Sequence, residues 1–199
     1  DNKRYEERMR LFMNKAVVQK ETGHRDYEFL GPTYRMNEIT AAVGIPQIAR
    51  LRRVVLRRQE LGTLLTSLIG DIPGLKPAAV TRGSEHGYWA YPMRTPGFDG
   101  LEFARALSSE GVMTTHAYIG RPIYTCSKAL QNKNYIGDSS FPFTSEFTDR
   151  DFDYGEGTCP VAEEAMRRMV TIPINENFTD DNMVAISGAI SKVANGIGA

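Results

Sequence analysis

The sequence is poor in the residues that most often build metal sites and disulfide frameworks. It contains two cysteines and three histidines in 199 residues. Cys126 and Cys159 are not spaced like metal ligands, and two cysteines do not make a disulfide framework. No two histidines have the spacing that places metal ligands on one helix. We therefore expect no metal site and a reducing, cytoplasmic compartment.

An excess of charge and long apolar runs are also missing. Lysine plus arginine and aspartate plus glutamate both number 24, so the net charge is zero and generic binding of nucleic acid by a basic surface is disfavoured. No apolar run approaches the length of a membrane span, and residues 1–7 lack the apolar core of a signal peptide. We expect neither a nucleic-acid partner nor a membrane. The arginine run between residues 50 and 58 is best interpreted as an exposed helix face.

Residues 35–69 form the dominant helical pattern. Four leucines between residues 61 and 68 lie on one helical face. Pro46 cannot donate to the helical ladder, so we expect a kink or two abutting helices there. A charged helix at residues 2–12 precedes this pattern, and residues 14–31 have no period and indicate a loop or extended connection.

The rest of the chain alternates strands and helices. We expect strands at residues 88–93, 112–118 and 169–173. We expect helices at residues 101–110, 125–131, 161–168 and 179–194. This order implies a small sheet covered on one face by helices. Residues 132–158 have no period, and a loop of that length in a compact domain is usually functional or mobile.

An arginine lies at the beginning of the long helical pattern. Arg35 offers a planar fork of donors that suits phosphate or carboxylate. The N-terminus of a helix also favours anions, through its free N–H groups and its dipole. On chemistry alone, a solvated helix start is the simpler interpretation.

The segment around Arg35 also resembles a family signature. Gly31-Pro32-Thr33-Tyr34-Arg35-Met36-Asn37-Glu38-Ile39-Thr40-Ala41-Ala42 is similar to the motif that follows the cofactor-lysine region in the DegT/StrS family of pyridoxal-phosphate (PLP) sugar aminotransferases. Further segments resemble the family in the same order: Arg57-Arg58-Gln59-Glu60, residues 88–94, 111–118 and 159–165, Ile172-Pro173, and residues 178–181. The resemblance covers nearly the whole chain.

The resemblance implies the C-terminal part of a type-I PLP aminotransferase fold. The fold class of the whole enzyme is α/β, and that of this fragment is α+β. The fragment would have a long kinked helix, followed by a small, mainly antiparallel sheet covered by helices. Residues 1–75 would be the end of the large-domain region and a bridging helix. Residues 76–199 would form the small C-terminal α+β domain.

Two departures from the family pattern affect this interpretation. The family usually has asparagine where this chain has Thr33, whose hydroxyl reaches less far and has one donor fewer than an amide. The lysine that holds the cofactor precedes this region in the family. None of the chain's seven lysines lies in a matching context: Lys3, Lys15, Lys20, Lys76, Lys128, Lys133 and Lys192. We therefore assign no catalytic residue and expect the fragment alone to be inactive.

The resemblance also implies roles for six residues. Thr33 and Arg35 would reach across a dimer interface to the phosphate of the neighbouring subunit's PLP. Four residues would lie near the substrate: His116, Tyr118, Arg121 and Tyr124. Arg121 could pair with a diphosphate or with the carboxylate of the amino donor. The alternative is that the two tyrosines only pack and that Arg121 is solvated.

The implied parent enzyme is a homodimer that transfers an amino group from glutamate or glutamine. The acceptor would be the keto group of a nucleotide-linked sugar or of a keto-cyclitol. Residues 132–158, which are rich in aromatic residues, would form a flap over the substrate side of the site. The alternative function is that of a non-catalytic interaction or assembly module that retains the fold.

Overall fold

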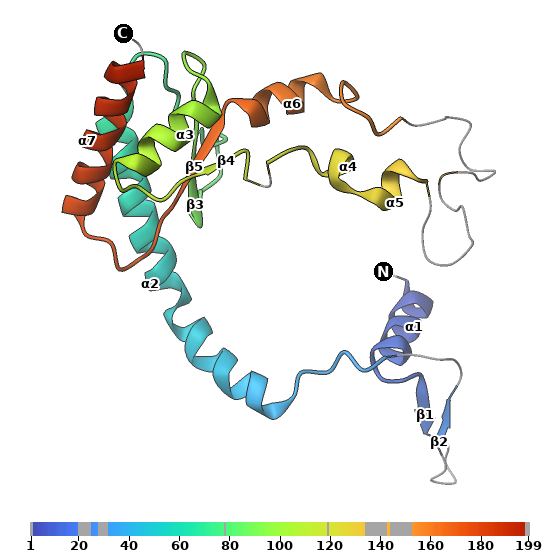
Figure 1. The fold of residues 1–199 in the computed structure, drawn as a ribbon. Coiled ribbons are helices and arrows are strands. Elements are labelled where there is room, and N and C mark those ends of the chain that lie inside the picture. The colour runs from blue at the N-terminus through green and yellow to red at the C-terminus, as the bar shows by residue number, and fades with distance from the viewer. Residues whose placement is uncertain are drawn as a thin grey trace. The chain divides into compact units, whose positions relative to one another are not determined.

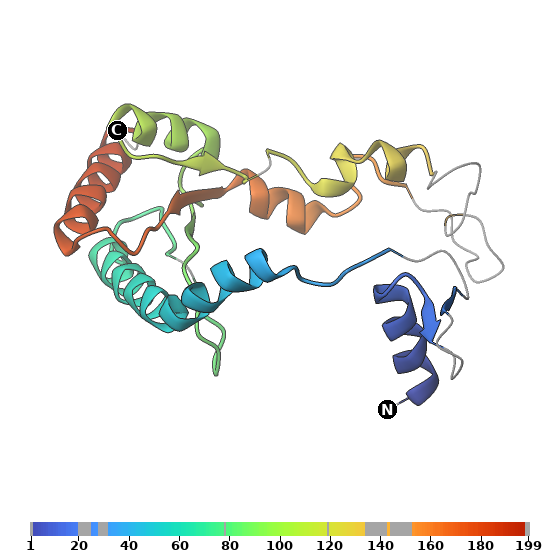
Figure 2. The same cartoon turned by 90° about the horizontal axis from the view of Figure 1, so that it is seen from below.

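The computed structural model describes residues 2–19, 25–27, 32–77, 79–118, 120–133, 143 and 153–197 (Figures 1 and 2). The chain divides into two compact units, residues 1–52 and 53–199. Within the described ranges, no helix combines the length and the apolar character needed to cross a bilayer. The domains inferred from the resemblance, 1–75 and 76–199, stay predictions. Most of the predicted flap, residues 132–158, lies outside the described residues.

The first unit begins with the predicted charged helix. Helix α1 spans Lys3–Met13, and the Asn2 side chain caps it by accepting a hydrogen bond from the Arg4 N–H at 3.1 Å. Residues 14–31 were expected to be a loop or extended connection, and the pairing of two short strands there was not predicted. Within that range β1 (Val17–Gln19) pairs antiparallel with β2 (Arg25–Tyr27).

Helix α2 spans Glu38–Ile69 and runs without a break through Pro46. It begins three residues later than the pattern predicted, because the Asn37 side chain accepts the Thr40 N–H at 2.8 Å and caps the first turn. Arg35 therefore lies before the helix, not in its first turn. The predicted C-terminal end of α2, at Ile69, is confirmed.

The second unit contains a three-stranded sheet. Strand β5 (Met169–Pro173) lies between β3 (Ala90–Arg94) and β4 (Thr115–His116), and both pairings are antiparallel. The prediction for β5 is confirmed at both ends, whereas the strand expected at 112–118 shrinks to two residues. The sequence-based fold class is thus confirmed as a long helix followed by a small antiparallel sheet with covering helices.

Helices cover one face of this sheet. The C-terminal half of α2, α3 (Gly100–Ser109) and α7 (Asp180–Ile197) are gathered on one side of the strands (Figures 1 and 2). Buried side chains from these helices meet the inward residues of β3 and β5: Leu61, Leu65, Phe103, Leu107, Met183, Ile190, Tyr91, Met93, Val170 and Ile172. Ala90, Pro92 and Arg94 alternate with the inward residues of β3 and lie on the opposite face.

The expected helix caps are present in this unit. The Asp99 carboxylate accepts the N–H groups of Leu101 at 3.0 Å and Glu102 at 2.9 Å, and the Glu102 N–H lowers the pKa of that carboxyl. Thr179 accepts the Asn182 N–H at 3.3 Å at the start of α7. These caps explain why both helices begin where the sequence placed them.

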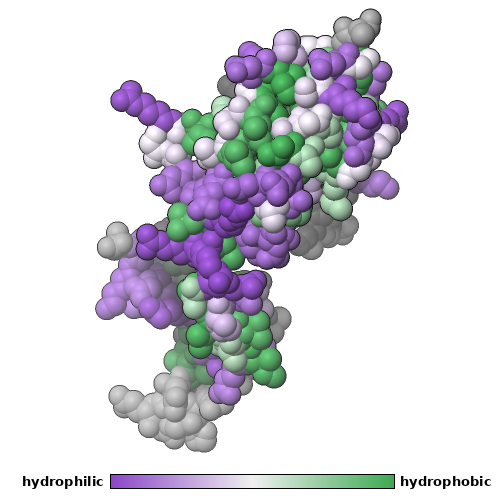
Figure 3. Space-filling view, turned by 90° about the vertical axis from the view of Figure 1, so that its left-hand side faces the viewer, coloured by the Kyte–Doolittle hydropathy of each residue, from purple (hydrophilic) through white to green (hydrophobic). Residues whose placement is uncertain are grey.

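Two arginines of the run in α2 bind the segment that leads into α7. Arg57 donates to Asp180 at 2.9 Å and to the Phe178 carbonyl at 3.0 Å, and Arg58 pairs with Glu176 at 2.7 Å. Figure 3 shows hydrophilic residues gathered beside an apolar patch on one face. Arg50, Arg52 and Arg53 are exposed, as predicted for this run.

Candidate active site

Side chains predicted to bind substrate border one cavity of about 250 Å³. Its walls come from β4, from α4 (Ile123–Cys126) with the loop before it, and from α6 (Pro160–Arg167). The polar lining residues are His116, Arg121, Thr125, Glu156, Glu163 and Arg167. A cavity of this size is close to the lower end of the range for small-molecule sites.

His116 is fixed by the end of α6. Its Nε2 atom lies 2.9 Å from the Arg167 carbonyl oxygen. Because a carbonyl oxygen can only accept, Nε2 carries a proton, and Nδ1 is an acceptor in the neutral form of the ring. Gly100 permits this arrangement, since a Cβ there would lie 2.4 Å from the same carbonyl oxygen and 3.1 Å from the His116 ring.

Arg121 has free donors at the cavity. Its Nε atom donates to the Cys126 sulfur at 3.1 Å, which orients the guanidinium. The Arg121 side chain has no other hydrogen bond or ion pair with a residue that the structure describes. The two Nη groups can therefore take a carboxylate or a phosphate.

Tyr124 contacts the cavity wall through Glu163. Its hydroxyl donates to the Glu163 carboxylate, which also accepts the N–H groups of Gly157 at 2.9 Å and Cys159 at 3.4 Å. Partial burial of the hydroxyl and this hydrogen bond raise the pKa of Tyr124 to about 12. The same hydrogen bond lowers the pKa of Glu163, so both directions describe one ionised carboxylate beside one neutral phenol.

Tyr118 lies apart from these residues. It is exposed and does not line the cavity, and its ring meets the edge of Trp89 with centroids 5.8 Å apart. Ala117 and Tyr118 both have positive φ values, 53° and 55°, which turns the chain sharply after β4. The structure thus brings His116 and Arg121 together, links Tyr124 to them through Glu163, and leaves Tyr118 beside Trp89.

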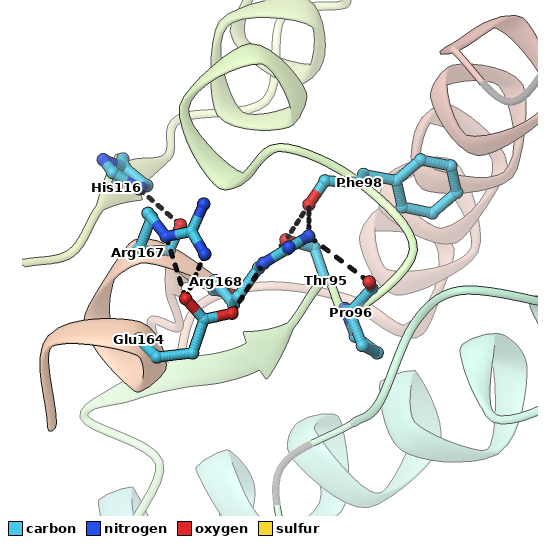
Figure 4. A network of polar contacts seen from close by, with 7 residues as sticks. All are labelled: Thr95, Pro96, Phe98, His116, Glu164, Arg167 and Arg168. Carbon is cyan, nitrogen blue, oxygen red and sulfur yellow. Dashed lines mark hydrogen bonds and ion pairs between the residues drawn. The ribbon is translucent and has the colours of Figure 1, made fainter. Parts of the chain in front are cut away.

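Arg167 is a cavity residue that the sequence reasoning missed. Its guanidinium is held by Glu164, whose other oxygen accepts from Arg168 Nε at 3.1 Å (Figure 4). These contacts lower the pKa of Glu164, with Arg167 as the main cause. The signal was present in the sequence, because an acid followed three and four residues later by arginines forms ion pairs on a helix.

The predicted phosphate ligands lie in the first unit, on the segment before α2. The backbone there pairs with the end of α1 and the residues after it: the Tyr34 N–H donates to the Met13 carbonyl and the Lys15 N–H to the Pro32 carbonyl, both at 3.0 Å. Thr33 and Arg35 are both exposed, and neither side chain has a hydrogen bond or ion pair with a described residue. An unpaired guanidinium and a nearby hydroxyl fit the phosphate of PLP.

The fold and the matched sequence define the class of this chain. Residues 1–191 match the model of the DegT/DnrJ/EryC1/StrS aminotransferase family. The chain therefore belongs to this family of PLP-dependent aminotransferases.

Individual relatives agree with this assignment. The chain is 24% identical over 191 residues to the spore coat polysaccharide biosynthesis protein SpsC of Bacillus subtilis, covering 92% of this chain and 44% of SpsC. It is 22% identical over 169 residues to the dTDP-4-dehydro-2,3,6-trideoxy-D-glucose 4-aminotransferase of Saccharopolyspora spinosa, covering 83% of this chain and 36% of that enzyme.

A solved structure shows the same fold. The sugar aminotransferase CalS13 of Micromonospora echinospora superimposes with a TM-score of 0.71 at 19% identity, over 96% of this chain and 45% of CalS13. The chain thus spans less than half the length of the relatives it matches.

Proposed function

We propose that this chain forms the C-terminal portion of a PLP-dependent aminotransferase that acts on a nucleotide-linked keto sugar or a keto-cyclitol. Glutamate or glutamine would be the amino donor. Family membership supports the reaction class. The Saccharopolyspora spinosa relative is a dTDP-sugar aminotransferase, which supports a nucleotide-linked substrate.

The observation that carries the proposal is the cavity that gathers His116, Arg121 and Arg167. The free Nη groups of Arg121 would bind the diphosphate of the substrate or the carboxylate of the donor. His116 Nδ1 would accept a hydrogen bond from a sugar hydroxyl. Tyr124 and Glu163 would hold the loop before α6 in place, because Glu163 also accepts the N–H groups of Gly157 and Cys159.

The cofactor site would be shared between subunits of a homodimer. Thr33 and Arg35 would hold the phosphate of PLP bound to the neighbouring subunit. PLP, when bound, supplies an electron sink for the carbon that carries the amino group. The residues of this chain would bind and orient, and the lysine that anchors PLP would come from outside the segments described here.

Ligand binding to the purified chain tests the cavity. We would measure the affinity of dTDP and of glutamate by calorimetry for the wild type, for Arg121→Gln and for the control Arg82→Gln. Arg82 is exposed and does not line the cavity. The two variants each lose one positive charge, but only Arg121→Gln loses it at the cavity. Loss of a charge-assisted contact is expected to weaken binding about ten- to a hundredfold in Arg121→Gln alone. Equal binding of both ligands by the two variants would contradict the assignment of Arg121.

A further inference from the structure

A second cavity is bordered by two cations that face each other across a β-ladder. Lys76 and Arg94 form an isolated antiparallel bridge in which each backbone N–H donates to the other's carbonyl, at 2.8 and 2.9 Å. Residues paired in this way carry their side chains on the same face of the ladder. Both residues line the cavity, on the sheet face opposite the helices that form the core.

Among the residues that the structure describes, none neutralises either cation. The side chains of Lys76 and Arg94 have no hydrogen bond or ion pair with any residue that the structure describes. Glu164 is the acid in the lining, and its two oxygens already accept from Arg167 and Arg168. Three cations, Lys76, Arg94 and Arg168, against one carboxylate give the lining a net charge of about +2 at pH 7.

The repulsion between Lys76 and Arg94 destabilises the folded state unless a bound anion offsets it. Like charges directly opposite each other in a ladder are destabilising. Arg168 cannot turn away to relieve the charge, because its Nη1 atom also donates to the carbonyls of Phe98 at 2.9 Å and Pro96 at 3.3 Å (Figure 4). The positive charge is therefore fixed at one side of the cavity.

The remaining wall is apolar and the space is large enough for a metabolite. The cavity has a volume of about 510 Å³, and its other lining residues are Pro96, Pro160, Val161 and Ala165. Small-molecule sites typically enclose roughly 300–1,000 Å³ and combine apolar walls with a few converging polar groups. A fitting ligand has an anionic end and an organic body.

We propose that this cavity binds a phosphate-bearing small molecule, with the phosphate between Lys76 and Arg94 and the organic part against the prolines and Val161. A phosphate monoester carries about −1.5 to −2 charges at neutral pH, which matches the lining better than a single carboxylate does. Arginine can hold two phosphate oxygens with its fork, while lysine adds a point charge. The inference does not depend on the proposed aminotransferase function.

The test measures phosphate binding without any turnover. The 199-residue chain would be titrated with inorganic phosphate, diphosphate and a nucleoside monophosphate, at an ionic strength kept constant with potassium chloride. Amide NMR shifts would locate the site and calorimetry would give the affinity. We expect the largest shifts at Lys76, Arg94 and Arg168. The nucleoside monophosphate should bind more tightly than inorganic phosphate, because only it reaches the apolar wall.

Charge-matched variants decide the outcome. Arg94→Gln and Lys76→Gln are each expected to weaken binding about ten- to a hundredfold, whereas Arg82→Gln outside the cavity should leave it unchanged. Without ligand, Arg94→Gln should melt at the wild-type temperature or above it, because one of two opposed charges is gone. Equal weakening in all three variants would mean an adventitious ion only. That result, or the absence of phosphate binding, overturns the proposal.

Discussion

At the scale of single residues, the contact between Tyr124 and Glu163 has a measurable signature. Partial burial of the phenol and its hydrogen bond to Glu163 raise the pKa of Tyr124 to about 12. We expect the Glu163→Gln variant to lower this pKa towards the ordinary tyrosine value of about 10, because the neighbouring charge is removed. Ultraviolet absorbance during alkaline titration follows the ionisation of the phenol.

A second variant identifies the tyrosine that responds. In Tyr124→Phe the step with a pKa of about 12 should vanish from the absorbance curve. Adding Glu163→Gln to that variant should then change nothing further. A shift that persists in the double variant would show that Glu163 acts on another of the nine tyrosines.

The same carboxylate predicts a pH dependence of stability. The pKa of Glu163 is lowered in the folded state, mainly by the Tyr124 hydroxyl. Its contribution is therefore present above the ordinary glutamate pKa and is lost as the pH falls through the lowered value. Between about pH 5 and pH 3, the free energy of unfolding should fall less in Glu163→Gln than in the wild type. Urea denaturation across this range measures it, with Glu7→Gln as a surface control. Parallel curves for all three proteins would contradict the prediction.

The hypothesis that Arg35 binds the phosphate of PLP can be tested by a single substitution. In a full-length homodimer, Arg35→Ala is expected to weaken PLP retention about ten- to a hundredfold, because one charge-assisted contact to phosphate is lost. The variant should fold normally, since Arg35 is exposed and has no contact partner among the described residues. Dialysis followed by PLP absorbance measures retention, and Arg52→Ala is a matched exposed control. Equal retention in both variants would remove Arg35 from the phosphate site.

Sequence reasoning named two residues that line one cavity, but it did not show how the lining residues are arranged. His116 and Arg121 were predicted near substrate, and they do border one cavity. The spacing after Glu164 indicated an ion pair for Arg167, but the place of Arg167 at this cavity depends on the antiparallel pairing of β4 with β5. The place of Tyr118 beside Trp89 follows from backbone geometry after β4, which residue types alone do not reveal.

At the scale of elements, local signals were reliable where a cap or an apolar run defined the boundary. Asp99 placed the start of α3, and the run Met169–Pro173 placed β5. The strand expected over residues 112–118 is shortened to Thr115–His116, and it ends where Ala117 and Tyr118 leave the extended conformation. The pairing of β1 with β2 was missed because these strands have three residues each, too few to show a period.

The close contact between Gly62 of α2 and Tyr88 leads to a prediction about core packing. A Cβ at Gly62 would lie 2.6 Å from the ring of Tyr88, which is buried in the core. Gly62→Ala should therefore destabilise the protein by about 1–3 kcal/mol, through overpacking that exceeds the gain in helix propensity. Gly188 in α7 has nothing within 4 Å of its Cβ position. Gly188→Ala should instead stabilise by about 0.5–1 kcal/mol.

Chemical denaturation of both variants measures the change in the free energy of unfolding, which should have opposite signs in the two. The comparison is internal, since both changes add one methyl group to a helix interior of the same unit. A stabilising Gly62→Ala would show that Tyr88 can move aside at little cost. The packing of Tyr88 against α2 would then not define this part of the core.

At the scale of the whole molecule, two cavities lie on different sides of one short helix. Glu163 and Arg167 of α6 face the first, whereas Glu164 lines the second. Glu164 binds both Arg167 and Arg168, so one carboxylate connects the walls of the two cavities. The family motif predicted this helix from Cys159-Pro160, but its position between two cavities depends on tertiary structure.

The last prediction concerns what the chain can do by itself. Its relatives are more than twice as long as the part it matches, and none of its lysines lies in the context of the family's cofactor lysine. A nucleophilic lysine needs a depressed pKa or a neighbouring base to react efficiently at neutral pH. We therefore expect no transaminase activity from this chain alone and no stoichiometric lysine adduct with PLP. Borohydride reduction with PLP, followed by peptide mapping and an assay with glutamate, checks both points. Labelling should be low and spread over several lysines, as surface amines give. Complete labelling of one lysine together with turnover would show that the chain contains its own catalytic centre.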